Sequence, residues 1–201
     1  MAHLTFWFEF ASTYSYLSAA RIMPLARAKD VNVRWRPFLL GPIFQAQGWS
    51  TSPFNIYSAK GNYMWQDMAR QITKYGLPPL VKPNEFPQNG LLAARLASVG
   101  VRDNWGHAFI RRVYHAQFAQ GRTISDESVL SEILEDLDQD PVALIARAKM
   151  DAEVKADLRR ATDQAQKLGV FGAPSFVTSD GTLFWGDDRL EDALDWQTAR
   201  M

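Results

Sequence analysis

Apolar residues alternate along the face of a short segment at the start of the chain. Within residues 3–10, every second residue from Leu4 to Phe10 is apolar, and Trp7 lies on the opposite face. A short, aromatic-rich run of this kind predicts a nearly buried strand. Residues 31–38 predict a second strand of similar length.

Between these two strands the apolar spacing becomes helical. The residues that follow at intervals typical of one helix face are Tyr16, Leu17, Ala20 and Leu25. We expect Pro24 to kink or weaken this helix, because proline removes a backbone hydrogen bond and clashes with the preceding turn. Strand, helix and strand of this length predict a βαβ unit with parallel strands and a right-handed crossover.

The middle of the chain, from about residue 62 to residue 168, is mainly helical in pattern, with a proline-rich loop between its first two helices. The predicted segments are a helix opening near 62, the loop 77–89, helices at 91–99, 104–119 and 127–137, and a further helix that begins at Pro141 with Asp140 as its N-cap.

Strand signals return near the end of the chain. Residues 175–178 and 182–185 flank the turn 179–181, and an Asp-Gly pair between two apolar runs predicts a hairpin. A last helix is expected to begin near Asp188. The order βαβ, helical block, ββα predicts an α/β fold with a thioredoxin-like core and a large all-helical insertion. Residues 1–40 and 169–201 would form the core, and residues 41–168 the loop and helical insertion.

Composition narrows the classes of function. The 201 residues contain 22 basic and 22 acidic side chains, a balance that gives no electrostatic argument for binding nucleic acid or an anionic membrane. The chain has no cysteine, which excludes disulfides, thiolate metal sites and a cysteine nucleophile within it. We find no long apolar span and no leader pattern, so a protein of the cytoplasm or of an organelle matrix is expected, with the cytoplasm as the prediction.

Ser12 lies where the first strand meets the first helix. Thioredoxin-like enzymes carry a Cys-x-x-Cys pair at this place, and here the segment runs from Ser12 to Ser15. Unpaired amides and the helix dipole favour negative charge there. A serine cannot exchange disulfides, but its hydroxyl can donate a hydrogen bond to the thiolate of another molecule. The alternative is an ordinary helix N-cap.

Two further stretches carry candidate chemistry. Ala173 and Pro174 directly precede a predicted strand, which suits a cis-proline turn, although an ordinary trans proline is the alternative. Asp188 opens the last predicted helix, at a position where its carboxylate could hold the α-ammonium of a γ-glutamyl group. Its alternative is a capping interaction with Glu191.

Together with residues 36–44 and 59–67, these stretches resemble the 2-hydroxychromene-2-carboxylate isomerase family and its relatives, the kappa-class glutathione transferases. The resemblance runs over essentially the whole chain. It implies a DsbA-like thioredoxin fold, glutathione as cofactor, a small aromatic or electrophilic substrate and a homodimer. It implies Ser12 as the catalytic serine beside the glutathione sulfur. The glutathione-binding positions carried over by matching are Lys60, Asp67, Val170, Ala173, Pro174, Asp187 and Asp188.

The chain departs from the family pattern at two places. Thr13 replaces the proline that commonly follows the serine, which a first helical position tolerates. Residues 48–53 lack the asparagine that usually contacts glutathione, so that contact is unassigned or belongs to a hydroxyl. No metal site is expected, and His3, His107 and His115 have no sequence relation to Ser12 that would suggest a catalytic triad.

Three functions stay open at this point. The resemblance implies an isomerase that converts 2-hydroxychromene-2-carboxylate to trans-o-hydroxybenzylidenepyruvate through reversible thiol addition. A kappa-type glutathione transferase or peroxidase would use the same thiolate, and a non-catalytic binding protein would merely retain the fold. The aromatic residues that are candidates for the substrate pocket, or alternatively for ordinary core packing, are Trp49, Tyr63, Trp65, Phe86 and Trp105.

Overall fold

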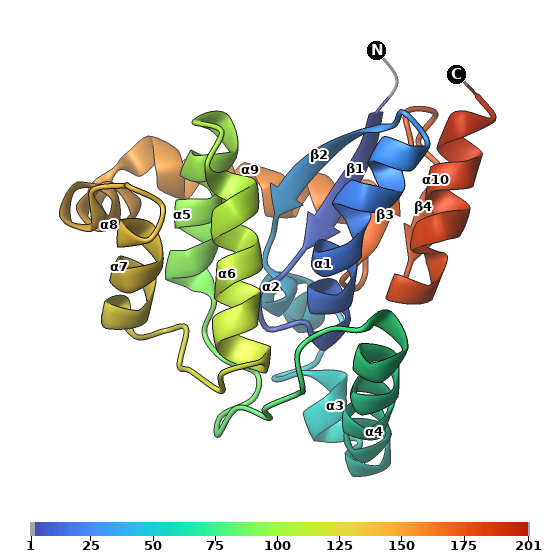
Figure 1. Cartoon of the computed structure of the whole chain (residues 1–201), viewed down its shortest axis with the longest axis horizontal. Helices are drawn as coiled ribbons and strands as arrows, with labels where there is room; N and C mark the ends of the chain where they lie inside the picture. The colour runs from blue at the N-terminus through green and yellow to red at the C-terminus, as the bar shows by residue number, and fades with distance from the viewer. Residues whose placement is uncertain (1–2, 201) are drawn as a thin grey trace.

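The computed structural model describes residues 3–200, and within this range the strands form one four-stranded sheet (Figure 1). Its order is β2-β1-β3-β4. β1 pairs parallel with β2 and antiparallel with β3, and β3 pairs antiparallel with β4. The strands are β1 (His3–Phe8), β2 (Asn32–Pro37), β3 (Ser175–Val177) and β4 (Leu183–Trp185).

Helices cover both faces of this sheet and extend well beyond it (Figure 1). They are α1 (Thr13–Ala28), α2 (Leu40–Ala46), α3 (Pro53–Ile56), α4 (Ser58–Tyr75), α5 (Leu91–Arg102), α6 (Gly106–Phe118), α7 (Glu127–Glu135), α8 (Pro141–Met150), α9 (Ala152–Lys167), the short 3₁₀ helix η1 (Asp187–Arg189) and α10 (Leu190–Thr198).

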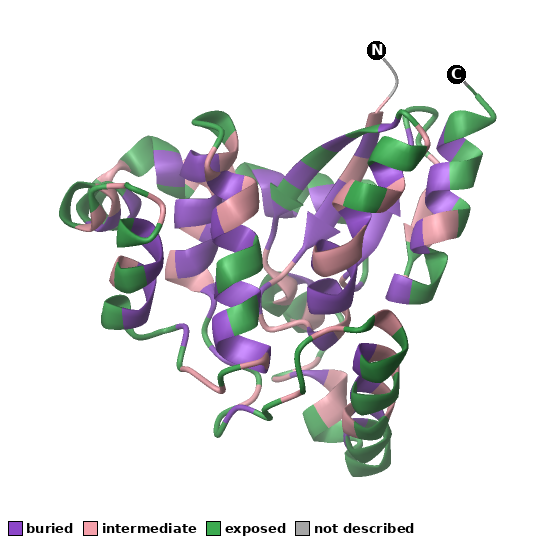
Figure 2. Cartoon of the chain, viewed as in Figure 1, coloured by how far each residue is buried: buried purple, intermediate pink, exposed green. Residues whose placement is uncertain are grey.

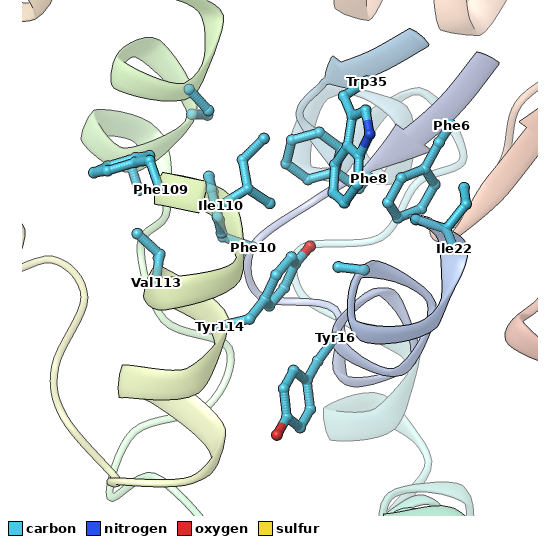
Figure 3. Close-up of a cluster of buried hydrophobic side chains, with 14 of the residues drawn as sticks. Phe6, Phe8, Phe10, Tyr16, Ile22, Trp35, Phe109, Ile110, Val113 and Tyr114 are labelled. Atoms are coloured by element: carbon cyan, nitrogen blue, oxygen red, sulfur yellow. The ribbon is translucent and has the colours of Figure 1, made fainter. Parts of the chain in front are cut away.

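The larger hydrophobic core lies between one face of the sheet and the helices α1, α6 and α10. Phe6 is at its centre, with its ring centroid 5.0 Å from that of Trp35 and 5.4 Å from that of Phe176. The core continues through Phe8 to Tyr114 of α6, which ties the helical block to the sheet (Figure 3). Buried residues follow the inward faces of the helices throughout (Figure 2).

A second, smaller core lies on the opposite face of the sheet. Trp7 and Val177 point to this side and pack with Phe38, with Ala161 and Ala165 of α9 closing the cluster. Because β1 is covered on both sides, its residues are apolar on both faces, which is typical of a central strand. The prediction of a nearly buried first strand is therefore confirmed.

The predicted fold class is confirmed, but the first strand is two residues shorter than expected. The chain turns after Phe8, because the backbone oxygen of Glu9 accepts the N–H of Ser12 at 3.0 Å. This turn delivers Ser12 to the start of α1. Pro24 lies inside α1, which continues to Ala28, so the proline does not end the helix.

Other boundaries also differ from expectation. The sequence pattern assigns residues 41–61 to a loop, but they contain α2, α3 and the first turn of α4. The helix beginning at Pro141 is confirmed, with Asp140 accepting the N–H of Ala143 at 3.0 Å. The helical pattern that follows is broken at Asp151, which ends α8 and caps α9.

The predicted hairpin is present at the end of the sheet. β3 and β4 are antiparallel neighbours, and Gly181 in the turn between them has φ of +86°. Glycine adopts this left-handed conformation without a steric cost. The final helix is preceded by η1, so its regular α part begins at Leu190, two residues later than expected.

Candidate active site

A cavity of about 810 Å³ opens where the C-terminal end of β1 meets the start of α1. This volume falls within the range of roughly 300–1,000 Å³ that is typical of small-molecule sites. Its wall is built from the turn 9–14, the segment 39–54 with α2 and the start of α3, Lys60 of α4, the loop 86–91, the loop 171–174 and the end of β4.

Ser12 lies in this wall and makes two hydrogen bonds that join separate parts of the chain. Its Oγ accepts the N–H of Ser15 at 3.1 Å, which makes it the N-cap of α1. The same hydroxyl donates its proton to the backbone oxygen of Ala173 at 2.8 Å. The N-cap alternative is therefore confirmed as one role of Ser12, and the hydroxyl also contacts the loop expected to form the other half of the site.

The start of α1 presents unpaired backbone donors to the cavity. Thr13 and Tyr14 line the wall, and as the first two helical residues they have no intrahelical acceptor for their N–H groups. Neither N–H donates to any acceptor within residues 3–200. Such amides, together with the helix dipole, stabilise an anion that binds at the helix start.

The loop before β3 forms the opposite side of this corner. The Ala173-Pro174 peptide bond is cis, which confirms that expectation. Ala173 and Pro174 both line the cavity. Val170 does not line it within the described chain. It is buried in the smaller core, where its N–H donates to the backbone oxygen of Ala165 at 2.9 Å.

The two candidate residues of α4 occupy different positions. Lys60 is exposed and lines the cavity, with its ammonium 4.9 Å from the centre of the Tyr57 ring. Asp67 lies outside the lining residues found in the range 3–200. It accepts the hydroxyl proton of Tyr14 at 3.0 Å, and Tyr14 is itself in the wall. Asp67 therefore contacts a residue of the cavity wall, Tyr14, without lining the cavity itself.

Asp187 is buried behind the wall, with 4% of its surface exposed. Its carboxylate accepts hydrogen bonds from Ser18 at 2.8 Å, from Arg21 at 3.0 Å and from Tyr75 at 3.1 Å. Burial raises the pKa of the Asp187 carboxyl, and the nearby Arg21 guanidinium opposes this rise. The residue joins α1, α4 and η1, and its predicted contact with a ligand would have to form beside these partners.

Asp188, the next residue, has the opposite environment. Its side chain is 73% exposed and lies 3.2 Å from the guanidinium of Arg189. It is two residues after Gly186, which lines the cavity. The capping alternative for Asp188 is wrong, because neither η1 nor α10 has a side-chain hydrogen bond at its N-cap. Its carboxylate lies close to Gly186, since a side-chain carbon at Gly186 would be only 2.5 Å from Asp188 Oδ1.

Aromatic residues supply much of the remaining wall. Of the five predicted candidates, Trp49 and Phe86 line the cavity. Within residues 3–200 the other three lie elsewhere: Trp65 packs edge-on against Phe86 at 5.0 Å, Trp105 packs against Phe109, and Tyr63 is exposed.

Sequence reasoning missed a second aromatic pair at the rim. Phe171 and Trp185 both line the cavity, and their ring centroids are 4.8 Å apart. Both side chains are exposed. The sequence did contain a signal for this pair. Phe171 stands two residues before Ala173, and Trp185 two residues before Asp187, so both lie in stretches that already held candidate residues.

The segment that lacks the expected asparagine contributes hydroxyl groups to the cavity wall. Ser50, Thr51 and Ser52 all belong to its wall. The Ser52 hydroxyl also accepts the N–H of Phe54 at 3.3 Å, which caps α3. This agrees with the option that a hydroxyl supplies the contact. The three histidines lie outside the wall within the described chain, so no histidine adjoins Ser12 there.

Glu9 also belongs to the wall, although the sequence analysis did not single it out. Its Oε2 accepts the N–H of Ala11 at 2.9 Å, and its backbone oxygen accepts the hydroxyl proton of Tyr114 at 2.9 Å. Burial raises the pKa of the Glu9 carboxyl to about 8, and the Ala11 hydrogen bond opposes this rise. This raised pKa favours the protonated form of the carboxyl near neutral pH. A carboxylate ending an apolar strand was the available signal.

Comparison with known proteins finds relatives that match this chain over almost its whole length. The family model of the DsbA-like thioredoxin domain matches residues 3–195. A 2-hydroxychromene-2-carboxylate isomerase from Sphingobium xenophagum is 31% identical over 189 residues, which cover 94% of each protein. A kappa 2 glutathione S-transferase from Caenorhabditis elegans is 29% identical over 209 residues, covering 95% of this chain and 89% of the relative.

Solved structures agree with these sequence matches. A 2-hydroxychromene-2-carboxylate isomerase structure superposes with a TM-score of 0.85 at 26% identity, covering 98% of this chain and 94% of the other. A probable DsbA oxidoreductase from Streptomyces coelicolor reaches a TM-score of 0.81 at 18% identity, covering 100% and 92%, and this likeness concerns the fold alone. Among residues 3–200, no helix is both long enough and apolar enough to cross a membrane.

Proposed function

This chain belongs to the family of DsbA-like thioredoxin domains, and within it to the 2-hydroxychromene-2-carboxylate isomerase family, and we propose that it is a glutathione-dependent isomerase acting on 2-hydroxychromene-2-carboxylate. The observation that carries the proposal is the corner of the cavity where the Ser12 hydroxyl and the unpaired amides of α1 face the loop of Ala173. A homodimer remains a prediction from the resemblance, and a cytoplasmic location remains a prediction from the sequence.

The residues around the cavity fit a thiol tripeptide. Ser12 and the amides of Thr13 and Tyr14 suit a thiolate, because hydrogen bonds to an ion are about twice as strong as those between neutral groups. The loop at Ala173 offers backbone groups to a peptide. Lys60, which lines the cavity, suits a carboxylate, and Asp188, two residues after the wall residue Gly186, suits an α-ammonium.

Bound glutathione would supply a thiol that adds reversibly to the unsaturated substrate, so that a double bond becomes a single bond that can rotate. The work of the protein is then to hold the sulfur as an anion. Ser12 redirects its proton from the Ala173 oxygen to the sulfur, and the α1 amides add electrostatic stabilisation. Trp49 and Phe86 offer flat apolar surfaces to an aromatic ring.

A kappa-type glutathione transferase is the second candidate. It is favoured by the 29% identity to the Caenorhabditis elegans enzyme over nearly the whole chain. Both candidates share the thiolate corner and differ in the acceptor, so the choice depends on the wall formed by α2, α3 and the loop 86–91. A non-catalytic binding protein is the third candidate, and it would bind glutathione without activating it.

The purified protein should convert 2-hydroxychromene-2-carboxylate to the trans-benzylidenepyruvate in the presence of glutathione, as followed by absorbance. The thiol pKa of bound glutathione, titrated by thiolate absorbance, should lie below that of the free thiol. Thiol activation without isomerisation, but with conjugation of chloroarenes, would favour the transferase. An unshifted or raised thiol pKa would refute the thiolate mechanism for both enzymes.

We predict that Ser12→Ala retains the fold and loses most of the activity. Loss of an N-cap costs about 1 kcal/mol of stability, whereas loss of a hydrogen bond to the thiolate should lower kcat by roughly ten- to a thousand-fold, by analogy with oxyanion donors. Asp140→Ala, which removes the N-cap of α8 far from the cavity, is the matched control. Equal activities of the two variants would show that Ser12 acts as a helix N-cap and not as a catalytic residue.

A further inference from the structure

Glu9 is the one carboxyl group in the cavity wall within residues 3–200. The other side chains in the wall that can titrate are Tyr14 of α1 and Lys60 of α4. Glu9 precedes Ser12 by three residues, in a turn closed by the hydrogen bond from the Ser12 N–H to the Glu9 backbone oxygen at 3.0 Å. The carboxyl and the hydroxyl therefore both belong to the cavity wall and are carried by the same turn.

The two oxygens of the Glu9 carboxyl have different surroundings. Oε2 accepts the N–H of Ala11, which fixes the orientation of the group. Oε1 makes no hydrogen bond to any residue between 3 and 200 and lies against the loop 86–91. A side-chain carbon at Gly90 would be only 3.4 Å from Oε1 and 3.0 Å from Phe10 Cβ, so glycine permits this close approach.

We propose that Glu9 is the general acid and base of this cavity. It gives a proton to the carbonyl oxygen of an α,β-unsaturated acceptor as the carbon–sulfur bond forms, and takes the proton back as that bond breaks. The inference rests on the proposed function, because it names the proton donor for the same thiol addition. It assigns the cavity an acceptor class, namely conjugated ketones and aldehydes.

The proton transfer balances within the site. As sulfur bonds to the β-carbon, the π electrons of the acceptor move to its carbonyl oxygen. The O–H bond of Glu9 breaks, a new O–H bond forms on that oxygen, and the electron pair of the broken bond stays on the carboxylate. After rotation, the carboxylate recovers the proton, the double bond re-forms and sulfur leaves. No oxidant or reductant is required.

The environment of Glu9 suits this task better than that of the other titrating groups in the wall. Burial raises the pKa of its carboxyl to about 8, so the proton is present at neutral pH and the conjugate base is accessible. The Tyr14 hydroxyl already donates to Asp67, and burial raises its pKa. Tyr114 of α6 faces the same turn, but its hydroxyl donates to the Glu9 backbone oxygen.

The test compares Glu9→Gln, Glu9→Asp and the distant control Glu135→Gln on the exposed side of α7. Glutamine keeps the volume and the acceptor for Ala11 but cannot transfer a proton. The assay uses glutathione with an unsaturated aryl ketone and, separately, with a chlorodinitrobenzene, from which chloride leaves without a proton. Glu9→Gln should lower kcat with the ketone by roughly 10²–10⁴-fold, and this loss should exceed the loss with the chloroarene by roughly tenfold or more.

A second measurement reports on the carboxyl itself. The infrared difference spectrum between the wild type and Glu9→Gln, without glutathione, should show the band of a protonated carboxyl at neutral pH. That band should vanish as pH rises through about 8. The alkaline limb of kcat/KM with the ketone should fall over the same range in the wild type, be missing in Glu9→Gln and return in part in Glu9→Asp.

The outcomes separate the two proposals. If Ser12→Ala abolishes activity with the ketone but Glu9→Gln retains the wild-type rate and alkaline limb, the thiolate mechanism stands and the role of Glu9 is overturned. An ionised carboxyl at neutral pH would overturn it as well. Equal losses with ketone and chloroarene would make Glu9 a structural residue. If the wild type adds thiols to neither acceptor, both proposals fall.

Discussion

Two adjacent aspartates show how strongly a single residue's surroundings decide what it can do. Asp187 is buried and accepts hydrogen bonds from Ser18, Arg21 and Tyr75, whereas Asp188 is exposed and pairs with Arg189. The sequence offers two neighbouring carboxylates without distinguishing them. A buried carboxylate that loses its charge leaves its partners unsatisfied, whereas an exposed one does not.

This contrast gives a prediction for the γ-glutamyl end of the site. Asp188→Asn should weaken glutathione binding by about 1.5–3 kcal/mol, because it removes a charge-assisted hydrogen bond to the α-ammonium. Its free energy of unfolding should change by no more than about 0.5 kcal/mol. Isothermal titration and denaturant unfolding measure the two quantities.

Asp187→Asn serves as the matched comparison. It should lower the free energy of unfolding by about 2 kcal/mol, since Arg21 is left with a weaker partner in a buried place. Unchanged glutathione affinity in both variants would contradict the placement of the γ-glutamyl end at η1.

At this scale, the sequence predicts best the residues whose role follows from a position in the fold. Ser12 and Pro174 are found because they stand at the first helix start and before a strand, and both line the cavity. Val170 and Asp187 share those stretches but are buried, which depends on tertiary packing. Glu9 was missed although it directly follows an apolar strand, because no spacing rule reports the surroundings that raise the pKa of a single carboxyl.

At the scale of elements, the turns and caps are the most predictable parts of this chain. Asp140 with Pro141 and the Asp-Gly pair at 180–181 specify their local structures through contacts within a few residues. The segment 41–61 has the sequence pattern of a loop, because its helices are short and bury little: Ile43 is the one buried residue of α2, and α3 has none. Such helices lack the periodic apolar face on which sequence analysis depends.

The hairpin turn supplies a prediction for one element. Gly181→Ala should lower the free energy of unfolding by about 1 kcal/mol, because a side chain at φ of +86° is strained even though no atom lies within 4 Å of the added carbon. Gly41→Ala is the control, since Gly41 has equal space but lies within a helix. It should be neutral or stabilise by up to about 1 kcal/mol. Equal effects in denaturant unfolding would contradict this explanation.

At the scale of the whole molecule, the carboxyl of Glu9 in the cavity wall links folding to pH. Its pKa is about 8 in the folded protein and near 4.5 when the chain is unfolded. Between these values the folded state binds more protons than the unfolded state, so the free energy of unfolding falls as pH rises. The contribution is fully present below about pH 4.5 and is lost as pH passes about 8.

Denaturant unfolding of the wild type and Glu9→Gln at about pH 5 and about pH 8 tests this linkage. Groups common to both proteins cancel in the comparison. Across this pH range the free energy of unfolding of the wild type should fall by on the order of 3 kcal/mol more than that of the variant. This figure is smaller than the full pKa shift would give, because the carboxyl lines the cavity. Parallel pH profiles would show that Glu9 is ionised throughout.

The hydrogen bond between Ser12 and the Ala173 oxygen has a consequence for the empty protein. A hydroxyl has a single proton, so this bond must open before Ser12 can donate a hydrogen bond to a ligand. In the chain without a ligand, the Ser12 hydroxyl and the Ala173 oxygen are hydrogen-bonded to each other, so neither group is unpaired in the mostly apolar cavity. A peptide-like thiol that binds here would exchange this one internal hydrogen bond for two hydrogen bonds to the ligand. When the ligand leaves, the internal bond can form again, so the site returns to a state in which its polar groups are paired.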